Sequence, residues 1–272
     1  MTTTDTVVSS MVAAGLVAPG AAAHSARLPG GVVVHGVRVA QEHAERAWHF
    51  WRGRAGVVPL LTTRVTSAQD LTALASAAAE AGPPAESVPV AEASGTVARI
   101  VSRVGARSIA EAYPEDRAEE EELRDPARLV QLLDPPSGSA VAGNPLAFTP
   151  DWGIENLWLL LVEEGGGGGE SHRLPLLLPG FLSGSSTAWP DMCPLTPAEH
   201  SAFLRHWNAR YGAEVFFMGG TEMQLYVPRP PLDLPAIAAL AIEQNAYCDD
   251  LDDVIDTANG QARSTVWHFW WD

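Results

Sequence analysis

Four residues in the last third of the chain together offer a set of side chains that could bind zinc: two thiols, one imidazole and one carboxylate. They are Cys193, His200, Cys248 and Asp250. Thiolate, imidazole and carboxylate groups are the usual protein ligands of zinc, but the spacing does not match a known metal motif. Two buried thiols, a surface histidine and a helix-capping aspartate would explain the same residues. We therefore expect no cofactor, and a zinc site at these four positions is the alternative.

Nucleophilic catalysis has little support in the sequence. Residues 180–184, Gly-Phe-Leu-Ser-Gly, do not match the Gly-x-Ser-x-Gly turn that exposes a catalytic serine. Cys248 paired with His200 or His268 is the remaining candidate nucleophile. All 17 basic residues are arginine, and the chain has no lysine. This excludes a Schiff-base lysine and a phosphate-binding loop that requires Gly-Lys-Ser/Thr.

The charge of the chain favours basic partners over nucleic acids. Its formal net charge is −16, whereas nucleic-acid affinity comes from neutralising phosphates. Asp249, Asp252, Asp253 and Asp256 follow the spacing that places carboxylates on one helix face, and residues 119–122 are consecutive glutamates. A cation, a basic protein or water alone would each stabilise these charges. Solvation by water is the simplest explanation.

We expect no contact with a membrane. No uninterrupted apolar run approaches the roughly 20 residues that a membrane helix needs. Residues 1–23 include an apolar stretch but lack the basic start of a secretion signal. The sequence therefore indicates a cytoplasmic protein with a flexible N-terminus.

Hydrophobic periodicity predicts a strand-helix-strand unit in the first part of the chain, followed by further helices. The second helix begins at Ser67, with Asp70 as the acid of a capping box. The predicted elements are strands at 32–39 and 57–61 and helices at 41–54, 67–81, 97–104 and 119–132.

The last part of the chain has clearer boundaries. Thr196 and Glu199 form a capping box, Gly212 ends the helix that follows, and Asp233 starts another helix. The predicted elements are strands at 157–162, 174–178, 214–218, 223–227 and 265–271 and helices at 196–211 and 233–247. From residue 174 onward the order is βαββαβ, the pattern of ferredoxin-like folds.

The fold class expected from these elements is α+β, with a ferredoxin-like βαββαβ unit packed against the N-terminal strand-helix-strand region. The predicted parts are a flexible N-terminus at 1–30, an N-terminal α/β region at 31–134, a linker at 135–154 and a C-terminal α+β domain at 155–272. Right-handed crossovers would bring the four candidate zinc ligands toward one edge of the sheet.

The last six residues are Trp267-His268-Phe269-Trp270-Trp271-Asp272. As a strand, this segment has Trp267, Phe269 and Trp271 on one face and His268 and Trp270 on the other. We expect helices to cover the first face and the N-terminal region to cover the second. An exposed Trp270 would instead favour a partner-binding function.

Several motifs occur in a specific order and spacing in the last third of the chain. They are Trp189-Pro190, Cys193-Pro194, Trp207, Tyr211-Gly212-Ala213-Glu214, Arg229-Pro230-Pro231, Glu243-Gln244, Tyr247-Cys248-Asp249-Asp250 and the final Trp267 to Asp272. In these motifs the chain resembles the bacterial family called domain of unknown function DUF4253. Asp249 stands where the family typically has proline. The resemblance implies no activity that transfers to this chain.

These observations favour a non-enzymatic interaction protein, such as an acidic inhibitor or an immunity-like module, with a basic protein as its partner. The alternative is a small hydrolase or metal-dependent enzyme that uses the Cys/His/Asp cluster. Glu243 is expected either to have a shifted pKa or to pair with Arg205 or Arg229. The candidate binding residues are Trp189, Glu243, Tyr247, Asp250, Trp270 and Asp272.

Overall fold

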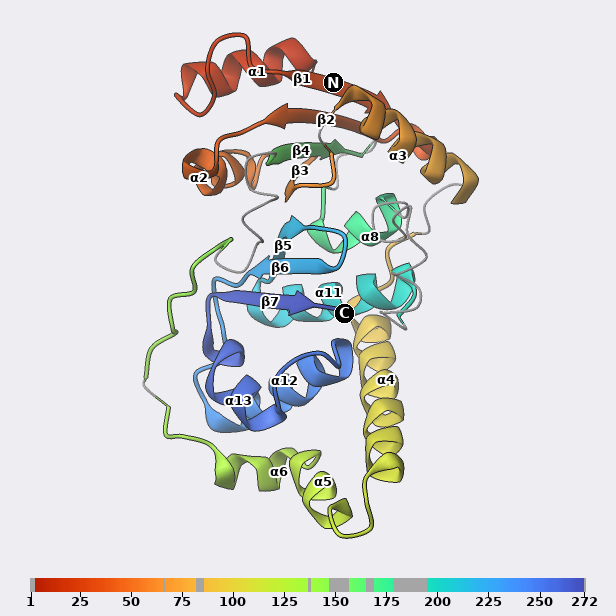
Figure 1. Ribbon diagram of the computed structural model, residues 1–272, viewed down its shortest axis with the longest axis vertical. Coiled ribbons are helices and arrows are strands. Elements are labelled where there is room, and N and C mark those ends of the chain that lie inside the picture. Colours follow the sequence, from red (N-terminus) through yellow and green to blue (C-terminus); the bar gives the residue numbers. More distant parts are fainter. Residues whose placement is uncertain are drawn as a thin grey trace.

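In the part of the chain that the structure describes, seven strands form one mixed sheet in the order β1-β2-β4-β3-β5-β6-β7. The computed structural model describes residues 3–65, 67–81, 86–136, 138–146, 157–164, 169–178 and 195–271. Figure 1 shows the strands stacked in this order from top to bottom. Their bounds are β1 Ala23–Arg27, β2 Val33–Arg38, β3 Val57–Thr62, β4 Trp158–Glu163, β5 Glu214–Met218, β6 Glu222–Tyr226 and β7 Val266–Trp270.

Helices cover the two faces of the sheet unequally. α1 and α2 pack on one face of β2, β3 and β4, whereas α3, α4, α8, α11 and α12 contribute to the core on the other face. The bounds of the helices are α1 Thr4–Ala13, α2 Gln41–Trp51, α3 Ala68–Ala81, α4 Val90–Glu111, α5 Arg117–Leu123, α6 Pro126–Leu129, α8 Leu174–Leu177, α11 Pro197–Tyr211, α12 Leu234–Tyr247 and α13 Val254–Asn259. Short 3-10 turns are η1 Pro29–Gly31, η2 Val130–Leu132, η3 Ser171–Arg173 and η4 Gln261–Arg263.

The interior strand β4 is apolar on both faces because it is covered on both. Leu160 and Val162 belong to the core beneath the larger helical layer, and Leu159 and Leu161 belong to the core beneath α1 and α2. This alternation follows from the two-residue period of a strand. β4 pairs antiparallel with both β2 and β3, so it joins strands that come much earlier in the sequence.

An aromatic core holds α11 and α12 against β7. Trp207 stacks on Phe269 with ring centroids 5.5 Å apart, and Tyr247 meets Phe269 edge-on at 4.8 Å. Trp207 and Phe269 have no solvent exposure. Full burial of such side chains contributes roughly 1.5–3 kcal/mol each, so this cluster is a main source of stability for the C-terminal part.

Several sequence predictions are confirmed, including the mixed α+β class. The strand-helix-strand unit appears as β2, α2 and β3, and the strands predicted at 214–218 and 223–227 appear as the antiparallel pair β5 and β6. Thr196 and Glu199 form both hydrogen bonds of a capping box, and Gly212 ends α11 in the left-handed conformation at φ 70°. Ser67 accepts from the backbone N–H of Asp70 at the start of α3.

The ferredoxin-like arrangement is wrong for the described strands. Residues 174–177 form α8 instead of a strand, and β5, β6 and β7 are consecutive antiparallel neighbours. The next strand is β3, which is parallel to β5 and pairs with it at Leu61 and Phe217. A short apolar run looks the same in a buried helix and a buried strand, and Pro175 in the first turn favours the helix.

The N-terminal segment also differs from the prediction. Instead of a flexible stretch, residues 4–13 form α1 and residues 23–27 form β1, and Val7 and Met11 are fully buried. The predicted helix at 119–132 is divided before Pro126, because a residue that precedes proline disfavours helical geometry. Since β4 pairs with N-terminal strands, residues 155–272 do not form a separate sheet, and the division into domains stays a prediction.

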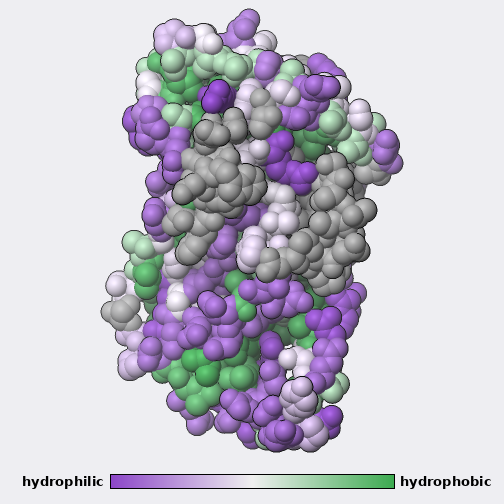
Figure 2. All heavy atoms as spheres, in the orientation of Figure 1, coloured by the Kyte–Doolittle hydropathy of each residue, from purple (hydrophilic) through white to green (hydrophobic). Residues whose placement is uncertain are grey.

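The surface shown in Figure 2 is mostly hydrophilic in its lower half, around a hydrophobic patch near the lower end of the molecule. Among the residues that the structure describes, no helix combines the length and apolar character needed to cross a membrane.

Candidate functional site

β7 is an edge strand, and its side chains divide between two faces as predicted. Trp267, Phe269 and Trp271 are fully buried, whereas Trp270 is 47% exposed. The prediction that the N-terminal region covers Trp270 is wrong. The N-terminal strands join the sheet beside β5, on the side away from β7. Exposure of Trp270 is the outcome that favours partner binding.

The outer edge of β7 is closed by groups of the chain itself. Val141 forms a parallel bridge with Ser264 at the start of the strand. The side-chain oxygen of Gln261 accepts from the backbone N–H of His268 at 2.7 Å. The Cys248 thiol donates to the carbonyl oxygen of Trp270 at 3.0 Å. These bonds occupy edge positions that another strand would use for pairing.

A groove of about 530 Å³ lies along this edge. Its lining includes residues 141–144, residues 250–252, the end of α13 with η4, and the outward side chains of β7. Two exposed apolar side chains, Val141 at 48% and Trp270 at 47%, face this groove. Its acidic lining residues are Asp250, Asp252 and Asp256. Among the described lining residues, the only basic side-chain type is the imidazole of His268, so the groove is suited to a positively charged group.

Next to Trp270, a buried polar network links β6, β7 and the backbone of Leu146. Glu222 accepts from Gln224 at 2.8 Å and from Nε2 of His268 at 3.2 Å. The Gln224 oxygen accepts from the backbone N–H of Leu146 at 2.9 Å. Leu146 has a φ of 62°, an unusual conformation for a residue with a branched side chain. The network therefore holds residues 141–146 against β6 and β7.

The candidate zinc ligands are only partly brought together. The predicted approach of the α11 start to the α12 end is found, because Nδ1 of His200 lies 2.8 Å from the Tyr247 hydroxyl. Burial lowers the pKa of His200 to about 3 and raises the pKa of Cys248 to about 12, so both side chains are neutral near pH 7. Asp250 is exposed at the groove.

A cysteine must be a thiolate to bind zinc, whereas burial raises the pKa of the Cys248 thiol and the thiol donates to a carbonyl oxygen. Within the described ranges, no group of three or more His, Cys, Asp or Glu side chains is arranged to hold a metal ion. Three candidate residues, Trp189, Cys193 and Asp272, lie outside the described residues. The zinc site therefore stays a prediction.

Two other candidates lie away from the groove. Tyr247 is buried in the aromatic core. Glu243 accepts from Arg210 at 2.9 Å, from His206 at 3.2 Å and from the Trp207 indole at 2.9 Å. Its predicted pairing with Arg205 or Arg229 is not the one observed, since Arg205 binds Glu170. Sequence reasoning missed this network because its donors come from one helix and its acceptor from another.

Nδ1 of His206 also lies 2.8 Å from the Ser94 hydroxyl. Ser94, His206 and Glu243 are thus linked in the same way as the serine, histidine and acid of a hydrolase triad. Ser94 is, however, an interior residue of the long helix α4, where backbone N–H groups are used by the helix and cannot form an oxyanion hole. The geometry fits a contact that joins α4, α11 and α12.

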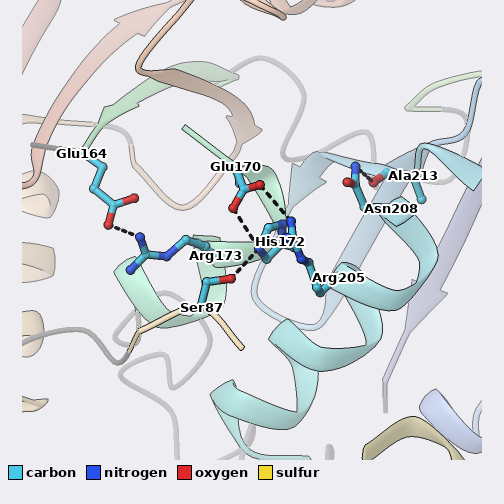
Figure 3. A network of polar contacts seen from close by, with 8 residues as sticks. All are labelled: Ser87, Glu164, Glu170, His172, Arg173, Arg205, Asn208 and Ala213. Carbon is cyan, nitrogen blue, oxygen red and sulfur yellow. Dashed lines mark hydrogen bonds and ion pairs between the residues drawn. The ribbon is translucent and has the colours of Figure 1, made fainter. Parts of the chain in front are cut away.

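A second polar network connects η3 and the segment before α4 with α11 (Figure 3). His172 is buried, and its Nε2 lies 2.9 Å from the Ser87 hydroxyl and 3.4 Å from Glu170. Burial is the main cause that lowers the pKa of His172 to about 4. Glu170 also accepts from Arg205 at 2.8 Å. A polar pocket of about 570 Å³ adjoins this network; nothing in the sequence pattern pointed to it.

No curated protein and no solved structure matches the chain. The match found is to a family model, and it includes β5, β6, β7, α11, α12, α13 and most of the groove lining. Residues 188–272 match the family described as domain of unknown function (DUF4253).

Proposed function

We propose that this protein is a non-enzymatic interaction protein that binds a basic segment of a partner protein in the groove beside β7. The observation that carries the proposal is the half-exposed Trp270 ring among acidic side chains. Exposed apolar groups bordered by polar residues are typical of interaction sites, and tryptophan is enriched among residues that dominate binding energy.

The charge of the groove supports a basic partner. Asp250, Asp252 and Asp256 line it, and the chain as a whole has a formal net charge of −16. Acidic surfaces accelerate encounter with basic partners, and salt weakens this attraction. We also propose a cytoplasmic location, because Cys248 is a buried free thiol and free thiols are typical of reducing compartments.

A peptide titration tests the proposal. The probe is a fluorescein-labelled peptide with three arginines and three lysines separated by glycine and serine, and the readout is fluorescence anisotropy at several salt concentrations. We expect binding that weakens with salt and becomes about five- to thirtyfold weaker in Trp270→Ala, because an aromatic contact with a cation contributes about 1–2 kcal/mol.

The matched control is Tyr113→Ala, which removes an exposed aromatic ring outside the groove and should leave the affinity unchanged. An acidic peptide of the same length should not bind. Failure of the basic peptide to bind, or equal affinity of wild type and Trp270→Ala, would contradict the proposal.

A further inference from the structure

We infer that the groove beside β7 recognises arginine in preference to lysine, with the guanidinium plane on the exposed face of Trp270 and its N–H groups on the groove carboxylates. This inference rests on the proposed function and specifies the side chain that is bound. It requires an aromatic face, carboxylates without other ion-pair partners, and access for a single projecting side chain.

The carboxylates of the acidic segment have different surroundings. Asp249, outside the groove, lies 3.7 Å from Arg107. Asp253 caps α13 by accepting from two backbone N–H groups. In the described part of the chain, Asp252 and Asp256 form no ion pair, and both are exposed at the groove. Their charges are therefore available to a ligand.

The protein contains an example of the same recognition within its own fold. The Arg52 guanidinium carbon lies 4.7 Å from the ring centroid of Tyr226 and 5.6 Å from that of Trp48. The same guanidinium forms a two-pronged contact with Glu214, with its Nε 3.0 Å from one carboxylate oxygen and a terminal nitrogen 2.8 Å from the other. Aromatic faces and a carboxylate thus bind one arginine at the same time.

Lysine cannot reproduce this combination. The planar guanidinium stacks on an aromatic ring while its N–H groups, which lie in the plane, reach carboxylates at the ring's edge. An ammonium group is a compact, strongly hydrated charge, and it must lose more of its hydration to touch the ring. Trp270 and the exposed carboxylates line one groove, so they favour the flat cation.

The closed edge of β7 decides how the arginine is presented. Because Val141, Gln261 and Cys248 occupy edge positions, a partner cannot add a strand to β7 without breaking these bonds. The arginine can therefore project from a loop or a helix, because the groove recognises the side chain and not the backbone conformation of the partner.

The test compares two labelled peptides that differ only in having six arginines or six lysines separated by glycine and serine. The full-length protein is titrated with each at the same salt concentration. We expect the arginine peptide to bind at least about fivefold more tightly. Trp270→Ala should bring the ratio of the two affinities close to one, and Trp270→Phe should retain part of the preference, since phenylalanine keeps a smaller aromatic face.

Two further variants separate charge from stacking. Asp252→Asn with Asp256→Asn should weaken both peptides, whereas Asp249→Asn, outside the groove lining, should change neither affinity by more than about twofold. Equal affinities of the two peptides for wild type would overturn the arginine preference and leave the proposed function standing. Absence of binding by both peptides would overturn both.

Discussion

Replacement of Glu243 by glutamine tests whether the network between α11 and α12 is a stabilising contact. The side chain of Glu243 is only 13% exposed, and its two oxygens accept from three donors. Glutamine has the same shape but a single acceptor oxygen. If that oxygen faces Arg210 and His206, the amide nitrogen faces the indole N–H of Trp207, and two donors then oppose each other in the interior.

The expected cost follows from these contacts. An unsatisfied buried donor costs about 1–3 kcal/mol, and the bonds to Arg210 lose charge assistance worth about 1 kcal/mol. We therefore expect Glu243→Gln to lower the free energy of unfolding by about 2–4 kcal/mol, measured by urea titration followed by tryptophan fluorescence.

A double-mutant cycle identifies the opposed donors as the cause. Trp207→Phe removes the indole N–H, so in that background Glu243→Gln should cost only about 1 kcal/mol. The matched control is Asp249→Asn, because Asp249 forms an exposed ion pair with Arg107; this substitution should cost less than about 0.5 kcal/mol. A cost for Glu243→Gln no larger than that of the control would refute the reasoning.

Two further predictions concern stability. The pKa of His200 is about 3 in the fold and 6.5 without burial, so as pH falls the unfolded chain binds a proton before the folded chain does. Between pH 7.5 and pH 5, His200 should therefore lower the free energy of unfolding by about 2 kcal/mol. Urea titrations of His200→Gln should lack this part of the pH dependence. Gly143→Ala should lower the free energy of unfolding by about 1–3 kcal/mol, because its Cβ would lie 2.6 Å from the Cβ of Val266. Gly95→Ala, in an open position on α4, should raise it by about 0.5–1 kcal/mol, and thermal melts that show the same sign for both substitutions would contradict this contrast.

The sequence predicted features whose cause is local. The capping box at Thr196 and the alternating faces of β7 depend on nearby residues, and both are found in the structure. The exposure of Trp270 could not be predicted, because it depends on the position of β7 at the sheet edge. Strand order arises from pairing over long separations, and the two-residue period of a strand carries no information about its neighbours.

The same distinction applies to the candidate sites. Asp250 and Trp270 were named from the sequence and line one groove, but Val141, the other exposed apolar side chain there, comes from the predicted linker. His206 and His172 gave no signal because a lone histidine has no spacing to recognise. Their roles become visible only through Ser94, Glu243 and the other residues that tertiary packing brings near them.

The place of β4 between β2 and β3 has a consequence for synthesis of the chain. Val33 pairs with Glu163, so β2 and β3 leave the ribosome long before the strand that joins them. Until β4 emerges, both strands keep unpaired edges, a state prone to association with other chains. The three strands that match the family model are closer together in the sequence than β3 and β4 are, so their edges stay unpaired for a shorter time. β2 and β3 therefore cannot complete their part of the sheet until β4 has been synthesised.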